Sequence, residues 1–175
     1  AIPTSRQGIF VATNAGGTTF FLLEFSASGA ISLFDSNYST GSAALITTQV
    51  FRDPSAWQHL VMAVDTTQAT ASNRYKLYLN GSQITSFSSA NYAAQNSTPY
   101  MNSSVQHYIG SYQPNTGNYF DGYMAEINFV DGQALTPSSF AETEATSGRW
   151  RPIAFTGSFG TNGFNLKLAD NSNNT

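Results

Sequence analysis

Acidic residues that could cleave a glycosidic bond are scarce in this sequence. The stretch EINFVD places Glu126 on an expected strand, and Glu24 lies in the stretch LLEFSAS. Retaining hydrolysis needs two carboxylates on one face about 5 Å apart, a spacing that alternate positions of a strand provide. On the face of Glu126 the following positions are Asn128 and Val130, while Asp131 has the wrong parity. Glu24 is similarly alone, so we expect no glycosidase of this type.

Other catalytic arrangements are also missing from the sequence. It has no GxSxG, HExxH or phosphate-loop motif and no cysteine, which leaves His59 and His107 as candidate bases. His59 sits inside an apolar stretch and His107 precedes YIGSY, and both contexts favour a hydrogen-bonded structural histidine over a catalytic one. The sequence therefore predicts a protein that is not an enzyme and needs no cofactor.

The loop SYQPNTGNYFDG is the best candidate for ligand binding. Sugar recognition uses a flat aromatic face together with planar amides that pair with hydroxyl groups. The loop supplies both kinds of side chain, in Tyr112, Asn115, Asn118 and Tyr119. A plain surface connection is the favoured explanation of this composition, because Asn, Gly and Pro are also the usual residues of turns. Of the two tryptophans, Trp57 is expected in the core, with a platform for a sugar as the alternative, and Trp150 is expected to pin the C-terminal part onto the rest of the domain.

The composition limits the fold and the partners. The chain has 175 residues, of which 41% are hydrophobic and 14% aromatic, so we expect residues 1–175 to form a single domain with its own core. Only 10% are charged, and the net charge of -3 comes without a cluster of Lys and Arg. This balance argues against nucleic acid and anionic membranes as partners. No apolar stretch approaches the ~20 residues of a membrane span, so no membrane insertion is expected.

Short β-rich stretches separated by turn residues recur along the chain and predict many strands. The expected strands span 8–12, 19–26, 30–35, 44–51, 57–65, 75–80, 83–87, 106–112, 120–130 and 163–168, with 88–104 as a long loop. Asn80-Gly81 predicts a type I′ hairpin, and apolar residues of both parities in WQHLVMAV predict a strand covered on both faces. The only helix candidate is TPSSFAETEA, with Thr136 as the cap and Pro137 in the first turn.

These patterns predict an all-β fold, a two-sheet antiparallel jelly-roll sandwich with at most one short helix. The residues expected in its core are apolar and lie on the central strands. They are Leu60, Met62, Val64, Leu77, Leu79, Ile109, Ile127 and Phe129.

Several of these segments resemble the concanavalin A-like lectin/glucanase superfamily, in particular its laminin G-like and pentraxin-like jelly rolls. The segments that carry the resemblance are AWQHLVMAVD, YKLYLNGSQI, YIGSY and FDGYMAEINFVDGQAL. Relatives of this kind often bind calcium through loop carboxylates and amides. Here the aspartates are scattered singly, at Asp35, Asp53, Asp65, Asp121 and Asp131, so we expect no metal site.

A narrower resemblance concerns the jelly-roll modules of bacteriophage tail and virion proteins. It rests on TTQATASNRYKLYLNG, DGYMAEINFVDGQALTPSSFAE and GTNGFNLKLAD, and it implies a non-enzymatic virion structural or attachment module. The expected location is the virion surface, with other virion subunits and a host-surface glycan as partners and a homo-oligomer or scaffold contact as the mode of assembly. We also expect the chain to be a fragment of a longer one. The alternative is a secreted or cell-surface carbohydrate-binding domain, and a glycoside hydrolase is a more distant one.

Overall fold

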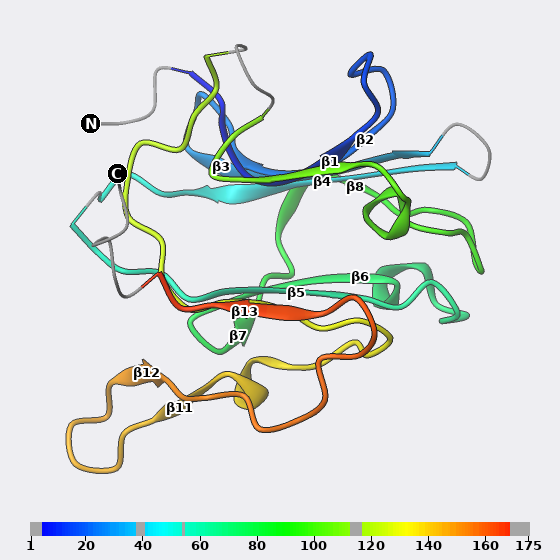
Figure 1. Ribbon diagram of the computed structural model, residues 1–175. Helices are drawn as coiled ribbons and strands as arrows, with labels where there is room; N and C mark the ends of the chain where they lie inside the picture. The colour runs from blue at the N-terminus through cyan, green and yellow to red at the C-terminus, as the bar shows by residue number, and fades with distance from the viewer. Residues whose placement is uncertain (1–4, 38–40, 54, 113–116, 169–175) are drawn as a thin grey trace, which may run out of the picture.

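The computed structural model is a layered β-sandwich and describes residues 5–37, 41–53, 55–112 and 117–168. Its largest layer is a six-stranded antiparallel sheet in the order β8-β4-β3-β2-β1-β9, drawn at the top of Figure 1. The strands of this sheet are β1 (Gln7–Thr13), β2 (Phe20–Phe25), β3 (Ala30–Asn37), β4 (Gly41–Val50), β8 (Phe87–Asn91) and β9 (Gln106–Ile109).

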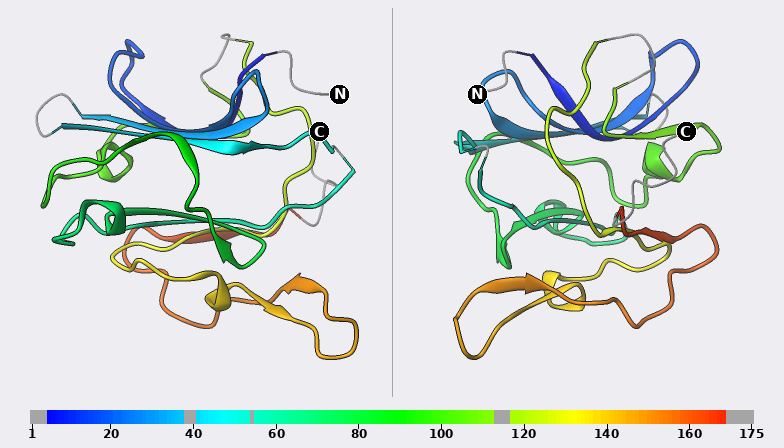
Figure 2. Two further views of the ribbon diagram at one scale, coloured as in Figure 1. Left: turned by 180° about the vertical axis from the view of Figure 1, so that it is seen from behind. Right: turned by 60° about the vertical axis from the view of Figure 1, so that its left-hand side comes forward.

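A second layer faces this sheet, and a thinner third layer lies outside the second (Figures 1 and 2). The second layer contains the sheet β5-β6-β7 and the pair β10-β13, and the third contains the hairpin β11-β12. The bounds are β5 (Leu60–Val64), β6 (Tyr75–Leu79), β7 (Ser82–Gln83), β10 (Ile127–Phe129), β11 (Ala141–Thr143), β12 (Trp150–Pro152) and β13 (Phe164–Leu166).

The only helical segments in the described part of the chain are short 3-10 turns. They are η1 (Ala71–Asn73), η2 (Tyr100–Asn102) and η3 (Pro137–Ser139). No helix there is long and apolar enough to cross a membrane. The predicted all-β class is confirmed.

The main core lies between the six-stranded sheet and β6. Alternate residues of the large sheet point inward because side chains of a strand alternate between its two faces. The buried members of this core are Ala12, Phe21, Leu23, Ile31, Leu33, Ala43, Leu45, Tyr75, Leu77 and Ala93. Of the predicted core residues, Leu77 is fully buried, and Leu60, Met62 and Val64 pack against this core while partly exposed. The other four, Leu79, Ile109, Ile127 and Phe129, are also only partly buried.

The outer face of β5 is covered as well, as its sequence predicts. Val61 and Ala63 point away from the main core and form a second small cluster with Tyr78, against which Phe140 packs. Phe140 belongs to the segment that forms the third layer, which explains why β5 has apolar residues of both parities. The Asn80-Gly81 hairpin is also confirmed, since β6 and β7 pair antiparallel around it and both residues have positive φ, 47° and 86°.

Four predictions about local structure are wrong. The strand expected at 83–87 does not form, since β7 ends at Gln83 and β8 begins at Phe87. The segment predicted as a helix forms η3 and then β11, because pairing with β12 satisfies its backbone while Phe140 packs on β5. Of the strand expected at 120–130, only Ile127–Phe129 forms. The stretch expected as a loop at 88–104 begins with most of β8, which pairs with β4 at the edge of the large sheet.

Candidate functional site

The loop predicted to bind a ligand is anchored across β1. The Gly110 N–H donates to the Ile9 carbonyl at 3.0 Å, and the Gly8 N–H donates to the Asn118 carbonyl at 3.3 Å. A Cβ at Gly8 would lie 2.8 Å from the carbonyl carbon of Ser111, so only glycine permits this close crossing. Asn118 thus contributes a backbone carbonyl to the anchor, and Asn115 lies outside the described residues.

The two predicted tyrosines of this loop differ in their surroundings. Tyr119 is 53% exposed. Tyr112 is half-buried, and the Arg6 guanidinium lies 6.0 Å from its ring centroid and 5.8 Å from that of Phe34. Burial raises the pKa of the Tyr112 phenol, the charge of Arg6 opposes this rise, and Glu24 adds to it. Tyr112 therefore packs beside an ion pair, and the sugar-binding role of the loop stays a prediction.

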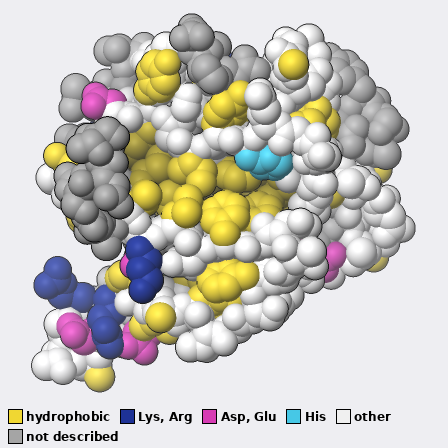
Figure 3. Space-filling model, viewed as in Figure 1, with side chains coloured by type: hydrophobic (Ala, Val, Ile, Leu, Met, Phe, Trp, Pro, Cys, Tyr) yellow, Lys and Arg dark blue, Asp and Glu magenta, His cyan; other side chains and the backbone are white. Residues whose placement is uncertain are grey.

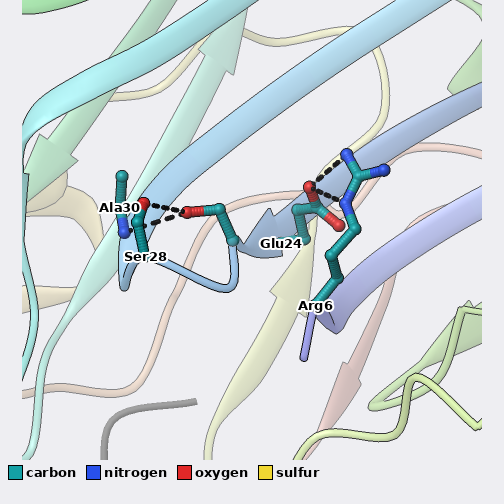
Figure 4. Close-up of polar contacts among 5 residues, drawn as sticks. Arg6, Glu24, Ser28 and Ala30 are labelled. Carbon is teal, nitrogen blue, oxygen red and sulfur yellow. Dashed lines mark hydrogen bonds and ion pairs between the residues drawn. The ribbon is translucent and has the colours of Figure 1, made fainter. Parts of the chain in front are cut away.

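That ion pair joins Arg6 to Glu24 of β2 (Figure 4). Arg6 Nε and Nη2 lie 2.9 and 2.6 Å from the same oxygen, Glu24 Oε1. The Glu24 side chain is fully buried, and Oε2 has no hydrogen-bond partner among the described residues. Burial raises the pKa of Glu24, while the hydrogen bond and charge of Arg6 lower it.

Glu24 does not form a catalytic pair with the other buried carboxyl, Asp35. Glu24 is opposite Gly8 and Ser32 in the register, so it points outward, whereas Asp35 is opposite Phe21 and points into the core. The two carboxyls therefore cannot flank one glycosidic bond. Glu126, the other predicted candidate, is exposed, precedes β10 and has a positive φ of 52°.

A cleft of about 370 Å³ opens between the layers at the end of β5. It is formed by three segments that are distant in the sequence, 62–66, 99–102 and 129–134. Its lining residues are Met62, Val64, Asp65, Thr66, Pro99, Met101, Asn102, Phe129, Val130, Asp131, Gly132, Gln133 and Ala134. Figure 3 shows a hollow between the layers in which hydrophobic side chains gather. The sequence contained no signal for this cleft beyond the separate strands and turns.

The floor of the cleft is apolar and its rim is polar. Met62, Val64 and Met101 are partly buried against the main core, and Phe129 stacks on Phe10 and Phe164 with centroid distances of 5.7 and 5.6 Å. Small-molecule sites commonly combine such a surface with a few polar groups that fix orientation.

The rim carries negative charge. Asp65 accepts hydrogen bonds from the Thr67 hydroxyl and from Gln68 Nε2, both at 2.6 Å, and these bonds lower the pKa of its carboxyl. Asp131 Oδ2 accepts a hydrogen bond from Asn162 Nδ2 at 2.9 Å. None of the residues that line the cleft is Lys, Arg or His.

Both histidines and Trp150 have structural contacts. Trp150 Nε1 donates to His59 Nδ1 at 3.0 Å, and burial lowers the pKa of His59. The ring of Trp150 also covers Gly81, so Trp150 connects the third layer to the hairpin, as predicted. The ring nitrogens of His107 lie 2.9 Å from the carbonyl oxygens of Val105 and Met101.

Trp57 is 69% exposed, so its predicted place in the core is wrong. The reason is that β5 begins only at Leu60 and leaves Trp57 in the preceding loop. Within the described ranges, no three His, Asp or Glu side chains come together as metal ligands. The absence of a calcium site stays a prediction.

The fold and the cleft define a class of protein, an all-β sandwich domain with an open cleft between its layers. A family model described as the concanavalin A-like lectin/glucanases superfamily matches residues 2–141. The chain belongs to this superfamily. Comparisons with curated proteins and with solved structures found no match.

Proposed function

We propose that this domain is a non-enzymatic attachment module on the surface of a bacteriophage particle, where it assembles with other virion subunits and holds host-surface glycans. The observation that carries the glycan-binding part is the cleft between the layers, with its apolar floor and polar rim. The superfamily also suggests carbohydrate binding or a related role.

The cleft suits a short stretch of glycan. Its volume of about 370 Å³ is at the low end of the ~300–1,000 Å³ typical of small-ligand sites. Amide side chains such as Asn102 and Gln133 can pair with sugar hydroxyls, and the apolar floor can accept C–H surface. A shallow site of this size supports weak single-site binding, which multivalency on a particle would raise by ~10²–10⁴.

The carboxyl geometry supports a binding role without hydrolysis. Glu24 and Asp35 point to opposite faces of one sheet, and Glu126 lies outside β10. Asp65 and Asp131 both line the cleft, but their carboxylate oxygens accept hydrogen bonds from neighbouring side chains. For Asp65 these bonds lower the pKa and so favour the ionised form, whereas hydrolysis also requires a carboxyl that can donate a proton.

The virion part of the proposal rests on three features. The segments quoted for the narrower resemblance are like those of phage virion modules. The low charge allows extensive contacts without the desolvation cost of buried ions. Within the described sheet, β8 and β9 each have one neighbouring strand, and such edges are available for pairing with another subunit.

Two measurements test the proposal together. Electron microscopy of an intact particle should locate the domain on its surface, and a glycan array should show weak binding by the isolated domain and stronger binding by a multimer. Gln133→Ala should weaken binding to the array. A monomer that is absent from particles and binds one glycan tightly would favour a secreted carbohydrate-binding domain. Failure of every glycan to bind would contradict the attachment role.

A further inference from the structure

The polar atoms on the rim of the cleft are not all occupied. Within the described part of the chain, Asp131 Oδ1 and Gln133 Oε1 have no hydrogen-bond partner, although Asp131 Oδ2 and Gln133 Nε2 do. Asn102 donates its backbone N–H to the Pro99 carbonyl, and its side-chain amide has no partner there. The rim therefore offers acceptors at Asp131 and Gln133, and at Asn102 an amide that can both donate and accept.

The floor below this rim can bury a methyl group. Met62, Val64 and Met101 present aliphatic and thioether surface, and Phe129 is already stacked on two other rings. A sugar hydroxyl placed there would lose its water without gaining a partner, which is unfavourable. A methyl group placed there would gain apolar contacts.

The charge of the rim discriminates against acidic ligands. Asp65 and Asp131 supply two carboxylates to the lining, which contains no cationic side chain. Lys76, whose charge also lowers the pKa of Asp65, pairs with Ala63 and so points to the opposite face of this sheet from Met62 and Val64. A sialic acid, a uronic acid or a phosphorylated sugar would meet like charge in the cleft.

Taking the glycan-binding function as a premise, we infer that the cleft selects an uncharged N-acetylhexosamine residue. Its acetamido methyl packs on the Met62 and Met101 floor. Its amide N–H donates to Asp131 Oδ1 or Gln133 Oε1, and its carbonyl accepts from Asn102 Nδ2. A 6-deoxyhexose offers a methyl group without an amide. It can pack its methyl on the apolar floor, but it leaves the polar side chains of the rim without hydrogen-bond partners.

Titration calorimetry of the full chain with matched sugars tests this selection. The ligands are a β-1,4-linked trimer of N-acetylglucosamine, the glucose trimer of the same linkage, a 6-deoxyhexose glycoside and an oligosaccharide that contains uronic acid. The loss of a group that both fills an apolar site and pairs with polar atoms should weaken binding at least tenfold. We therefore expect the glucose trimer and the 6-deoxyhexose to bind at least tenfold more weakly, and the uronic acid ligand not to bind measurably.

Variants locate the site. Asn102→Ala should weaken the N-acetylglucosamine trimer about tenfold, and Asn102→Lys should admit the uronic acid ligand by adding a cation to the rim. Asn91, an exposed residue of β8 outside the cleft, provides the matched control, and Asn91→Ala should bind like the wild type. Thermal unfolding of each variant checks that the fold is retained.

Each other outcome overturns the inference in a distinguishable way. Equal binding of the acetylated and plain trimers, both weakened by Asn102→Ala, would overturn the N-acetyl selection and leave glycan binding intact. If neither Asn102 variant changes binding, the sugar binds outside the cleft and the inference is wrong. If none of the four sugars binds and a wider glycan array is also negative, the proposed function fails as well.

Discussion

Replacing Tyr75 by Phe removes one hydroxyl from the centre of the sandwich, where it connects the two layers. The Tyr75 hydroxyl on β6 donates to Asp35 Oδ2 on β3 at 2.7 Å, and the two residues are 1% and 2% exposed. The other Asp35 oxygen accepts from the Tyr100 N–H at 3.1 Å, so the variant leaves one carboxylate oxygen without its donor. A hydrogen bond to a charged group contributes ~1.5–3 kcal/mol, so we expect a loss of about 2 kcal/mol in the free energy of unfolding at pH 7.

The loss should depend on pH because Asp35 titrates. Burial raises the pKa of Asp35, and the hydrogen bonds from Tyr75 and Tyr100 lower it. Because the pKa of Asp35 is raised in the folded state, the contribution of Asp35 to stability is fully present below the pKa that this carboxyl has in the unfolded chain. That contribution is lost as the pH rises through the folded-state pKa. Tyr75→Phe removes a bond that lowers the pKa, so the variant should lose less stability at pH 3, which lies below the ordinary pKa of an aspartate and where the carboxyl is therefore protonated, than at pH 7.

Urea unfolding at both pH values measures this difference, with Tyr78→Phe as the matched control. Tyr78 is on the same strand and 9% exposed, and its hydroxyl has no hydrogen-bond partner within the described residues. For a domain of this size ~1 kcal/mol corresponds to about 2–4 °C, so thermal unfolding at pH 7 should show a drop of about 4–8 °C for Tyr75→Phe. A loss equal to that of Tyr78→Phe at both pH values would refute the role assigned to the Asp35 pair.

Three further predictions concern the third layer, metal and catalysis. Trp150→Phe should lower the melting temperature because it removes the bond to His59, whereas Trp57→Phe should leave it unchanged because Trp57 is exposed; the reverse order would contradict the structure. Chelator should not change the melting temperature, and a drop of several degrees would reveal a metal site. Chromatography of β-glucans and bacterial polysaccharides incubated with the domain should show no hydrolysis products. Turnover that Glu126→Gln abolishes would show that a distant carboxyl completes a catalytic pair.

The parts of the fold that local chemistry determines could be predicted from the sequence. The type I′ turn predicted at Asn80-Gly81 requires positive φ at both residues, and both have positive φ in the structure. The two apolar parities of the strand at Leu60–Val64 indicated cover on both faces, which the main core and Phe140 supply. Trp57 was misplaced because an apolar neighbourhood in sequence does not reveal where a strand begins.

The candidate cleft could not be predicted in the same way. Its wall residues come from segments around Met62, Met101 and Gln133, and each segment alone has the composition of an ordinary strand end or turn. Whether these three segments come together depends on how the layers pack. This packing is set by long-range contacts, which leave no local pattern in the sequence. The loop that contains Tyr112 could be selected from its aromatic and amide side chains, but the sequence did not indicate that Tyr112 packs beside Arg6.

The most direct test of glycan binding in the cleft is methyl NMR of the methionines. The chain has three, of which Met62 and Met101 line the cleft. Met124 lies beside Gly110, where its methyl and sulfur are 4.0 Å from the position of an added Cβ, so it reports on the loop that contains Tyr112. Addition of the N-acetylglucosamine trimer should shift the signals of Met62 and Met101 and leave that of Met124 unchanged. A shift of Met124 alone, or of none of the three at saturating sugar, would contradict glycan binding in the cleft.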